Sequence, residues 1–249
     1  MFKRLLLLLL ILGNLFAVEL PDEVVAYWKL DEGTGNAIDA LEAYDLAEQG
    51  TVPNTTGIIG AARGPYNTFN YFANSSSVFN ATYFAVEGWF KTSGTGEGII
   101  GKSGTTSGWW VEVTTYGYVQ FALWGLSGFL VSPAAYNDGE WHYFYAANGP
   151  SSSRRLYVDN VLVASGTGGS FTTDSGNMTV GRRSTVTGGE VSGAIDECVY
   201  WNLTATSKSW TDIEAFIDAR WNDGKGAPYG GVNFTDKNFL DKNFLQKGQ

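Results

Sequence analysis

The chain has 249 residues and a formal net charge of −9 at pH 7, from 16 basic and 25 acidic side chains. Its Lys and Arg residues form no cluster that would neutralise several phosphates, which argues against nucleic-acid binding. The 32 glycines and an aromatic content of 15% favour many short strands joined by tight turns, and a β-sandwich of this length commonly forms one domain. The composition therefore predicts an all-β fold.

The N-terminal segment has the pattern of an export signal. Lys3 and Arg4 supply positive charge, residues 5–12 are an unbroken apolar run, and Ala17 offers a cleavage edge before Val18. The run is too short to favour a transmembrane helix. We expect residues 1–17 to be a signal peptide and the mature protein to be secreted or at the cell surface without a membrane span. An uncleaved membrane anchor is the alternative.

Residues 96–103 match the Walker A pattern, which in other folds cradles the phosphates of a nucleotide. That cradle requires a strand before the loop and a helix that starts at its Lys-Ser end. Here Lys102 and Ser103 lead into a turn rich in Gly and Thr, and then into a predicted strand that begins at Trp109. We therefore expect no nucleotide to bind at this segment.

Alternating apolar and polar residues predict two neighbouring strands over residues 109–113 and 119–124. Side chains on a strand point to opposite faces in turn, so one set faces the core and the other faces outward. The inward set is Val111, Val113, Val119, Phe121 and Leu123, and the outward set is Trp110, Glu112, Tyr118, Gln120 and Trp124.

The outward set is the candidate ligand site. The C–H face of a sugar ring stacks on aromatic rings, whereas its hydroxyls need polar partners, and this row offers both. A row with two Trp and one Tyr is also too apolar to leave bare without a reason. The alternatives are that a loop covers the rings, or that the register is reversed and they belong to the core.

The middle of the chain predicts a strand followed by a hairpin. Trp141 and His142 open the strand, and residues 155–163 consist of two apolar runs around an Asp159-Asn160 turn. His142 is the only histidine, and no convincing nucleophile and base accompany it, so we expect a scaffold role. The protein is accordingly predicted not to be an enzyme.

Three features follow toward the C-terminus. Cys198 is the only cysteine, so it forms no internal disulfide and is expected to be a buried thiol. Ile213, Phe216 and Ile217 recur at helical spacing, and Thr211 and Glu214 are the expected capping-box pair of one short helix. Residues 233–247 are a five-residue repeat in three copies, too short to bury a core of its own. We expect residues 229–249 to be a flexible tail or a partner-docking arm, with a pentapeptide-repeat coil as the alternative.

Five segments, in order, resemble the laminin-G-like jelly rolls of the concanavalin A-like lectin/glucanase superfamily. They are residues 24–35, 86–92, 141–163, 193–200 and 210–226. The resemblance implies one domain over residues 22–228, a two-sheet antiparallel β-sandwich of the jelly-roll type with one short C-terminal helix. Related glucanases carry two catalytic carboxylates in an E-x-D-x-x-E run on one strand, and that run is missing here. Residues 40–43 also replace the loop rich in Ser, Gly and Asn that the family has at this place.

The same resemblance implies a structural calcium ion. In such a jelly roll the first and last strands lie close together, so Asp31 or Asp39 would approach Asp196, and exported modules often hold Ca²⁺ with such carboxylates. The alternative is that Asp39 caps a turn and Asp196 accepts backbone hydrogen bonds. The altered loop at residues 40–43 counts against the metal.

Two functions follow from these observations. The first is an exported, non-catalytic carbohydrate-binding or adhesion module, whose partner is a glycan or a surface protein. The second is a structural surface or particle protein that assembles through its C-terminal tail. The aromatic row favours the first function and the repeat favours the second, while the oligomeric state stays open.

Overall fold

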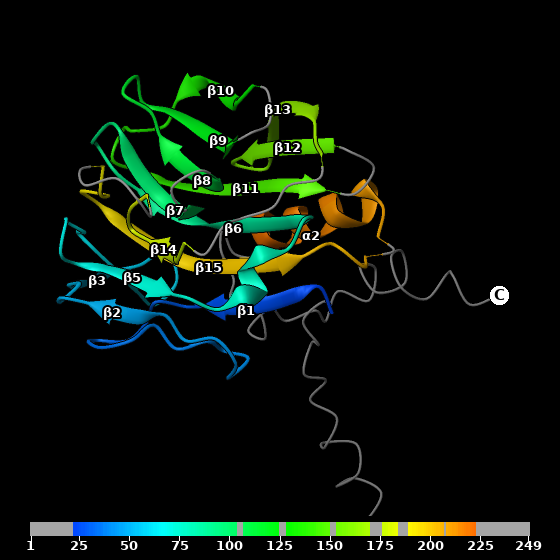
Figure 1. Cartoon of the computed structure of the whole chain (residues 1–249). Helices are drawn as coiled ribbons and strands as arrows, with labels where there is room; N and C mark the ends of the chain where they lie inside the picture. The colour runs from blue at the N-terminus through cyan, green and yellow to red at the C-terminus, as the bar shows by residue number, and fades with distance from the viewer. Residues whose placement is uncertain are drawn as a thin grey trace, which may run out of the picture. The chain divides into compact units, whose positions relative to one another are not determined.

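Two antiparallel β-sheets face each other across a buried core (Figure 1). The computed structural model describes residues 22–103, 107–124, 128–149, 153–169, 176–183, 189–206 and 208–222, all within one structural unit. The predicted signal peptide (1–17) and repeat tail (229–249) lie outside the described residues. The prediction of an all-β, two-sheet sandwich with one helix near the C-terminus is confirmed.

The first sheet has eight strands in the order β13-β12-β11-β6-β15-β4-β3, with β1 pairing to β15. Three of the neighbouring pairs along this path join strands that are distant in sequence, namely β11 with β6, β6 with β15, and β15 with β4. The strands are β1 (Val24–Trp28), β3 (Asn54–Thr56), β4 (Ala61–Arg63), β6 (Phe84–Lys91), β11 (Trp141–Gly149), β12 (Ser153–Val158), β13 (Val161–Thr167) and β15 (Ala194–Asn202).

The second sheet has seven strands in the order β10-β9-β8-β7-β14-β5-β2. Its strands are β2 (Ala47–Gln49), β5 (Tyr71–Asn74), β7 (Glu97–Ser103), β8 (Gly108–Val113), β9 (Tyr118–Trp124), β10 (Leu130–Ala135) and β14 (Met178–Val180). The segment with the Walker A pattern is therefore a strand, β7, inserted between β8 and β14, and the next described element is another strand rather than a helix.

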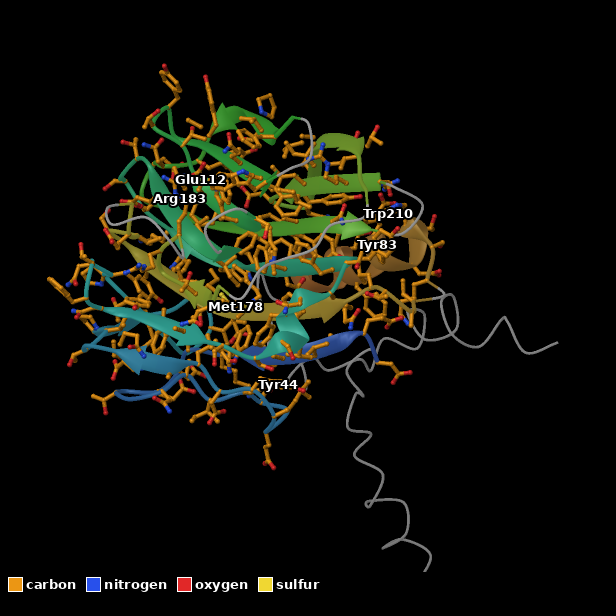
Figure 2. All side chains as sticks on the ribbon, viewed as in Figure 1. Tyr44, Tyr83, Glu112, Met178, Arg183 and Trp210 are labelled. Atoms are coloured by element: carbon orange, nitrogen blue, oxygen red, sulfur yellow. The ribbon has the colours of Figure 1, made fainter. Side chains whose placement is uncertain are left out.

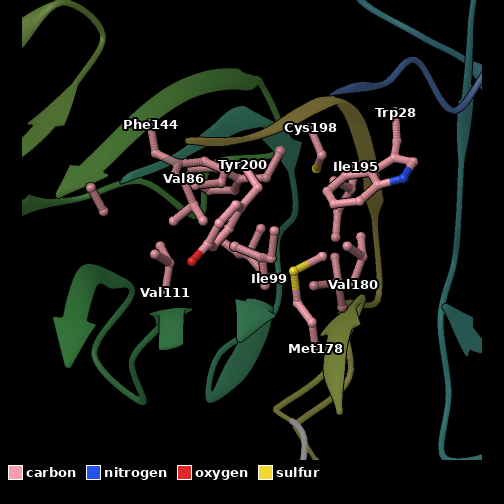
Figure 3. Close-up of a cluster of buried hydrophobic side chains, with 14 of the residues drawn as sticks. Trp28, Val86, Ile99, Val111, Phe144, Met178, Val180, Ile195, Cys198 and Tyr200 are labelled. Carbon is pink, nitrogen blue, oxygen red and sulfur yellow. The ribbon is translucent and has the colours of Figure 1, made fainter. Parts of the chain in front are cut away.

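The core lies between the two sheets, as the close-up in Figure 3 shows. Phe144 and Tyr200 of the first sheet face Val111 and Met178 of the second, and all four are fully buried. Cys198 is a buried free thiol, as expected. The five residues predicted to point inward from residues 111–123 are also fully buried, which confirms the predicted register.

One α-helix, α2 (Trp210–Asn222), packs on the outer face of the first sheet, and a short 3₁₀ helix, η1 (Ser77–Asn80), follows β5 (Figure 1). Trp221 stacks on Trp89 of β6 with ring centroids 5.5 Å apart, and Phe216 packs on Trp201 of β15. Within the described residues, no helix combines the length and apolar character that crossing a bilayer requires.

The predicted capping pair of the helix is wrong by two positions. Ser209 and Asp212 form the reciprocal bonds: the Ser209 amide donates to Asp212 Oδ2 (2.9 Å) and the Asp212 amide donates to Ser209 Oγ (3.3 Å). Glu214 instead accepts hydrogen bonds from Arg155 and Tyr157 of β12. Glu214 thus binds residues that are distant in the sequence, and it does not cap the helix as the local pattern predicted.

The β12–β13 hairpin holds His142 in place. Asp159 and Asn160 both have positive φ (50° and 65°), as the two central residues of a tight primed turn require. Asp159 Oδ2 lies 2.7 Å from His142 Nδ1, and Asp138 Oδ1 lies 3.0 Å from His142 Nε2. Both ring nitrogens are occupied, as expected of a scaffold histidine.

Candidate functional site

The outward residues of β8 and β9 form one continuous row on the second sheet. Glu112 pairs with Gln120, Trp110 pairs with Ala122, and Gly108 pairs with Trp124 across the two strands. Trp124 is 49% exposed and Tyr118 is 36% exposed, whereas Trp110 and Gln120 are half-buried. The structure therefore brings all five predicted residues together on the outer face, and the reversed register is excluded.

A pocket of about 360 Å³ opens at one end of this row. Three of the five predicted residues line it, namely Glu112, Tyr118 and Gln120. Trp110 and Trp124 lie farther along the row. The remaining lining residues are Gly96, Thr114, Thr115, Tyr116, Val131 and Arg183.

An ion pair forms the polar part of the pocket. Glu112 Oε2 lies 3.1 Å from Arg183 Nη1, and Glu112 Oε1 accepts a hydrogen bond of 2.7 Å from Gln120 Nε2. Both residues of the ion pair are labelled in Figure 2, where they lie next to each other. Glu112 is only 6% exposed, so its charge depends on these two partners in place of water.

Two glycines of β7 make room for this arrangement. Gly98 pairs with Glu112, and Gly101 pairs with Trp110. A Cβ on Gly98 would lie 2.4 Å from the backbone nitrogen of Arg183 and 2.6 Å from its Cγ, and a Cβ on Gly101 would lie 2.9 Å from Trp110 Cβ. The bare backbone of β7 thus lets Arg183 lie over the strand and reach Glu112 on β8.

Aromatic rings continue the row on both sides of the ion pair. Trp110 contacts Trp124 edge-on at 6.3 Å and Phe129 at 6.2 Å, and Arg183 lies 5.8 Å from the Trp110 ring. On the other side, Tyr116 lies 6.4 Å from Tyr118 and is 80% exposed. The site therefore combines apolar ring faces with a charged, hydrogen-bonding centre.

Sequence reasoning missed Arg183, Tyr116 and Phe129. Tyr116 lies in the turn between β8 and β9, and Phe129 directly precedes β10. Both therefore lie outside the stretches in which apolar and polar residues alternate, and that alternation was the signal used to find the site. Arg183 follows β14 and is 71 positions from Glu112, and no local signal joins the two. The row itself was found because a period of two is visible in the sequence.

The three predicted calcium ligands bind backbone amides. Asp39 accepts from the amides of Tyr27 (2.9 Å), Leu41 (3.0 Å), Ala43 (3.3 Å) and Tyr44 (2.9 Å), so both of its oxygens are engaged. This arrangement matches the turn-capping alternative.

Asp31 and Asp196 both accept hydrogen bonds from a different turn, the one that joins β3 to β4. Asp31 Oδ1 accepts from the Ala61 amide (2.7 Å), and Asp196 Oδ2 accepts from the amides of Ile58 (2.9 Å) and Ile59 (3.1 Å). Burial and the nearby Glu197 raise the pKa of Asp196 to about 8. Over the described part of the chain, no group of three or more His, Cys, Asp or Glu side chains is placed to hold a metal ion.

Comparisons with known proteins identify a matching family model and several solved structures of similar fold. A laminin-G-like family model, described as the concanavalin A-like lectin/glucanases superfamily, matches residues 66–209. No curated protein matches the sequence.

Among solved structures, domain 4 of AbnA, a GH43 extracellular arabinanase from Geobacillus stearothermophilus, in complex with arabinotriose, has a TM-score of 0.58 and 16% identity over 72% of this chain and 92% of that one. The binding domain of Paraclostridial Mosquitocidal Protein 1 has a TM-score of 0.64 and 10% identity over 81% of this chain and 53% of that one. A structure of botulinum neurotoxin type C, whose cell entry depends on two ganglioside molecules, has a TM-score of 0.57 and 13% identity over 80% and 51%.

The chain thus spans about half the length of the latter two structures, and at these identities the likeness shows the fold alone. The family model, in contrast, matches more than half of the sequence. Three of the five segments, residues 86–92, 141–163 and 193–200, lie within the matched range, and the two-sheet sandwich agrees with the family. The chain belongs to the laminin-G-like family of the concanavalin A-like lectin/glucanase superfamily.

Proposed function

We propose that this protein is a non-catalytic carbohydrate-binding module that binds glycans on the outer face of β8 and β9. The observation that carries the proposal is the pocket in which the Glu112–Arg183 ion pair lies between exposed aromatic rings. Aromatic faces stack on sugar rings, and the ion pair with Gln120 supplies partners for hydroxyls. The likeness to domains solved with arabinotriose, or named for gangliosides, supports a glycan as the ligand class.

The chemistry of the pocket supports binding without catalysis. Glycoside hydrolysis canonically uses two carboxylates that flank the scissile bond. Glu112 is the only carboxylate among the described lining residues, and both of its oxygens are engaged by Arg183 and Gln120. His142, the only histidine, lies between Asp138 and Asp159 and does not line the pocket.

A glycan array and one pair of variants test the proposal. Trp124→Ala should abolish glycan retention while the free energy of unfolding stays within about 1 kcal/mol of the wild type, because the ring is half exposed. Leu162→Ala is the matched control, since Leu162 is exposed on β13 of the other sheet. Unchanged retention in Trp124→Ala, or no retention of any glycan by the wild type, would contradict the proposal.

We also propose export to the exterior or the cell surface, supported by the pattern of residues 1–17. Mass spectrometry of the exported protein should then find an N-terminus at or near Val18, and a product that still begins at Met1 would contradict cleavage.

A structural calcium ion remains part of the proposal. The hydrogen bonds that Asp31 and Asp196 accept from one turn support it, whereas both oxygens of Asp39 are engaged by amides. The alternative of a structural surface protein depends on the repeat tail, which lies outside the described residues.

A further inference from the structure

We propose that the pocket selects uncharged sugars with neighbouring hydroxyls, and that Glu112 excludes anionic sugars such as sialic and uronic acids. This inference rests on the proposed glycan-binding function and names the ligand class for the same site. It is carried by the pairing of the two charges that line the pocket.

The first step concerns charge. Among the described lining residues, Arg183 is the only cation and Glu112 the only anion, and they lie 3.1 Å apart. An anionic sugar that bound a remaining donor of Arg183 would lie beside the like-charged Glu112 carboxylate. An anionic sugar that displaced Glu112 would leave this carboxylate, only 6% exposed, without its counter-ion. Leaving a nearly buried charge unpaired is strongly unfavourable. The cost falls on acidic ligands alone.

The second step concerns hydrogen bonding. A sugar hydroxyl both donates and accepts, so two neighbouring hydroxyls fit a surface that offers an acceptor beside a donor. A carboxylate has about four acceptor positions and a guanidinium has five donors, so the Glu112–Arg183 contact and the Gln120 bond leave capacity on both groups. The Arg183 side chain is 28% exposed, which places part of that capacity within reach of a ligand. The pair thus matches a neutral diol without any charge being displaced.

The third step concerns length. Tyr118 is two residues from Gln120 on β9, and Trp124 is four residues from it in the other direction. At about 3.4 Å per residue, the Trp124 ring lies roughly 14 Å along the strand from the ion pair. One sugar ring over the pocket stacks on Tyr118 but does not reach Trp124. The row therefore fits a short chain of neutral sugars, with one ring over the ion pair and a later ring on Trp124.

The test compares neutral and acidic probes on the full mature chain. Arabinotriose, cellotriose and maltotriose serve as neutral probes, and 3′-sialyllactose and trigalacturonic acid serve as acidic probes, all titrated at one ionic strength. The wild type should bind at least one neutral probe at least about tenfold more tightly than either acidic probe. Glu112→Gln keeps the size of the side chain and releases Arg183, so it should weaken neutral binding about tenfold or more and strengthen acidic binding.

Arg183→Gln is the second variant, and it decides the matter if Glu112→Gln does not fold. It should weaken neutral binding and leave acidic binding no stronger, because it adds no free cation. Leu162→Ala should change neither. A wild type that prefers an acidic probe would overturn this inference while leaving the glycan-binding function intact. A wild type that binds no probe of either class, and no sugar on a broader array, would instead remove the proposed function itself.

Discussion

Asp196 should make the stability of this fold depend on pH, and one substitution should remove that dependence. Its carboxyl is fully buried on β15, and burial together with the nearby Glu197 raises its pKa from 3.8 to about 8. The amides of Ile58 and Ile59 donate to Oδ2, whereas Oδ1 has no hydrogen-bond partner among the described residues. Asp196→Asn keeps an oxygen for those two amides and does not ionise, so it reproduces the protonated side chain.

The direction of the effect follows from proton linkage. In the unfolded chain the carboxyl loses its proton near pH 3.8, whereas in the folded chain it holds the proton up to about pH 8. The folded state binds more protons between these values, so the free energy of unfolding falls as the pH rises through that window. One pKa unit corresponds to about 1.4 kcal/mol, so the wild type should lose roughly 4 kcal/mol relative to Asp196→Asn between pH 4 and pH 7.

Urea denaturation of the two proteins between pH 4 and pH 8 measures this difference. Groups distant from Asp196 titrate alike in both proteins, so their contributions cancel, and Asp196→Asn should become progressively the more stable protein. The series is run in EGTA, because a bound cation would favour the ionised carboxylate and hide the effect. A stability difference that stays constant from pH 4 to pH 8 would refute the argument.

Three further predictions concern the glycines, the histidine and calcium. Gly98→Ala should weaken glycan retention about tenfold or more, because the added Cβ would lie 2.4 Å from the backbone nitrogen of Arg183. Gly33→Ala is the control, since the space around its Cβ is open. Equal glycan retention by the two variants would contradict the role of β7. Burial alone would lower the pKa of His142, but its bonds to Asp159 and Asp138 outweigh this and raise it. In thermal melts, His142→Gln should therefore destabilise the protein more at pH 5.5 than at pH 8.5. The stabilisation by protonated His142 is complete below pH 6.5 and is lost as the pH rises through the raised pKa. An equal loss of stability at the two pH values would contradict this prediction. For the proposed calcium site, EGTA should lower the melting temperature. At free Ca²⁺ 100-fold above its Kd, the ion contributes about 2.7 kcal/mol to the free energy of unfolding, and EGTA removes that contribution. An unchanged melting temperature would remove the ion from the proposal.

The sequence was informative wherever the signal was local. The period of two over residues 109–124 predicted which side chains point outward, and the Asp159-Asn160 pair predicted a turn with two positive φ angles. The helix was found from its apolar spacing, but its cap was misplaced, because Glu214 binds Arg155 and Tyr157 rather than the helix start. Long-range partners compete with local ones in a way that local patterns do not register.

The candidate site also depends on long-range contacts that local sequence patterns do not predict. Glu112 was identified as an outward polar residue, but its partner Arg183 comes from beyond β14 and meets it only because β14 pairs with β7 and β7 pairs with β8. Gly98, which makes room for Arg183, lies within the segment that matches the Walker A pattern. Strand order is a property of the whole fold, so no window of the sequence contains it.

The exposed aromatic rings on the outer face of the second sheet contrast with the buried aromatic rings on the outer face of the first sheet. Outward positions of β6, β11 and β15 carry Trp89, Tyr145 and Trp201, and a sequence pattern would rank them as highly as Trp110 and Trp124. All three are nearly fully buried. Helix α2 packs on that face and stacks Trp221 on Trp89 and Phe216 on Trp201, whereas no described helix covers β8 and β9. The placement of one helix thus decides which aromatic face is buried and which stays exposed, and this exposure is the physical reason to look for the proposed glycan ligand on β8 and β9.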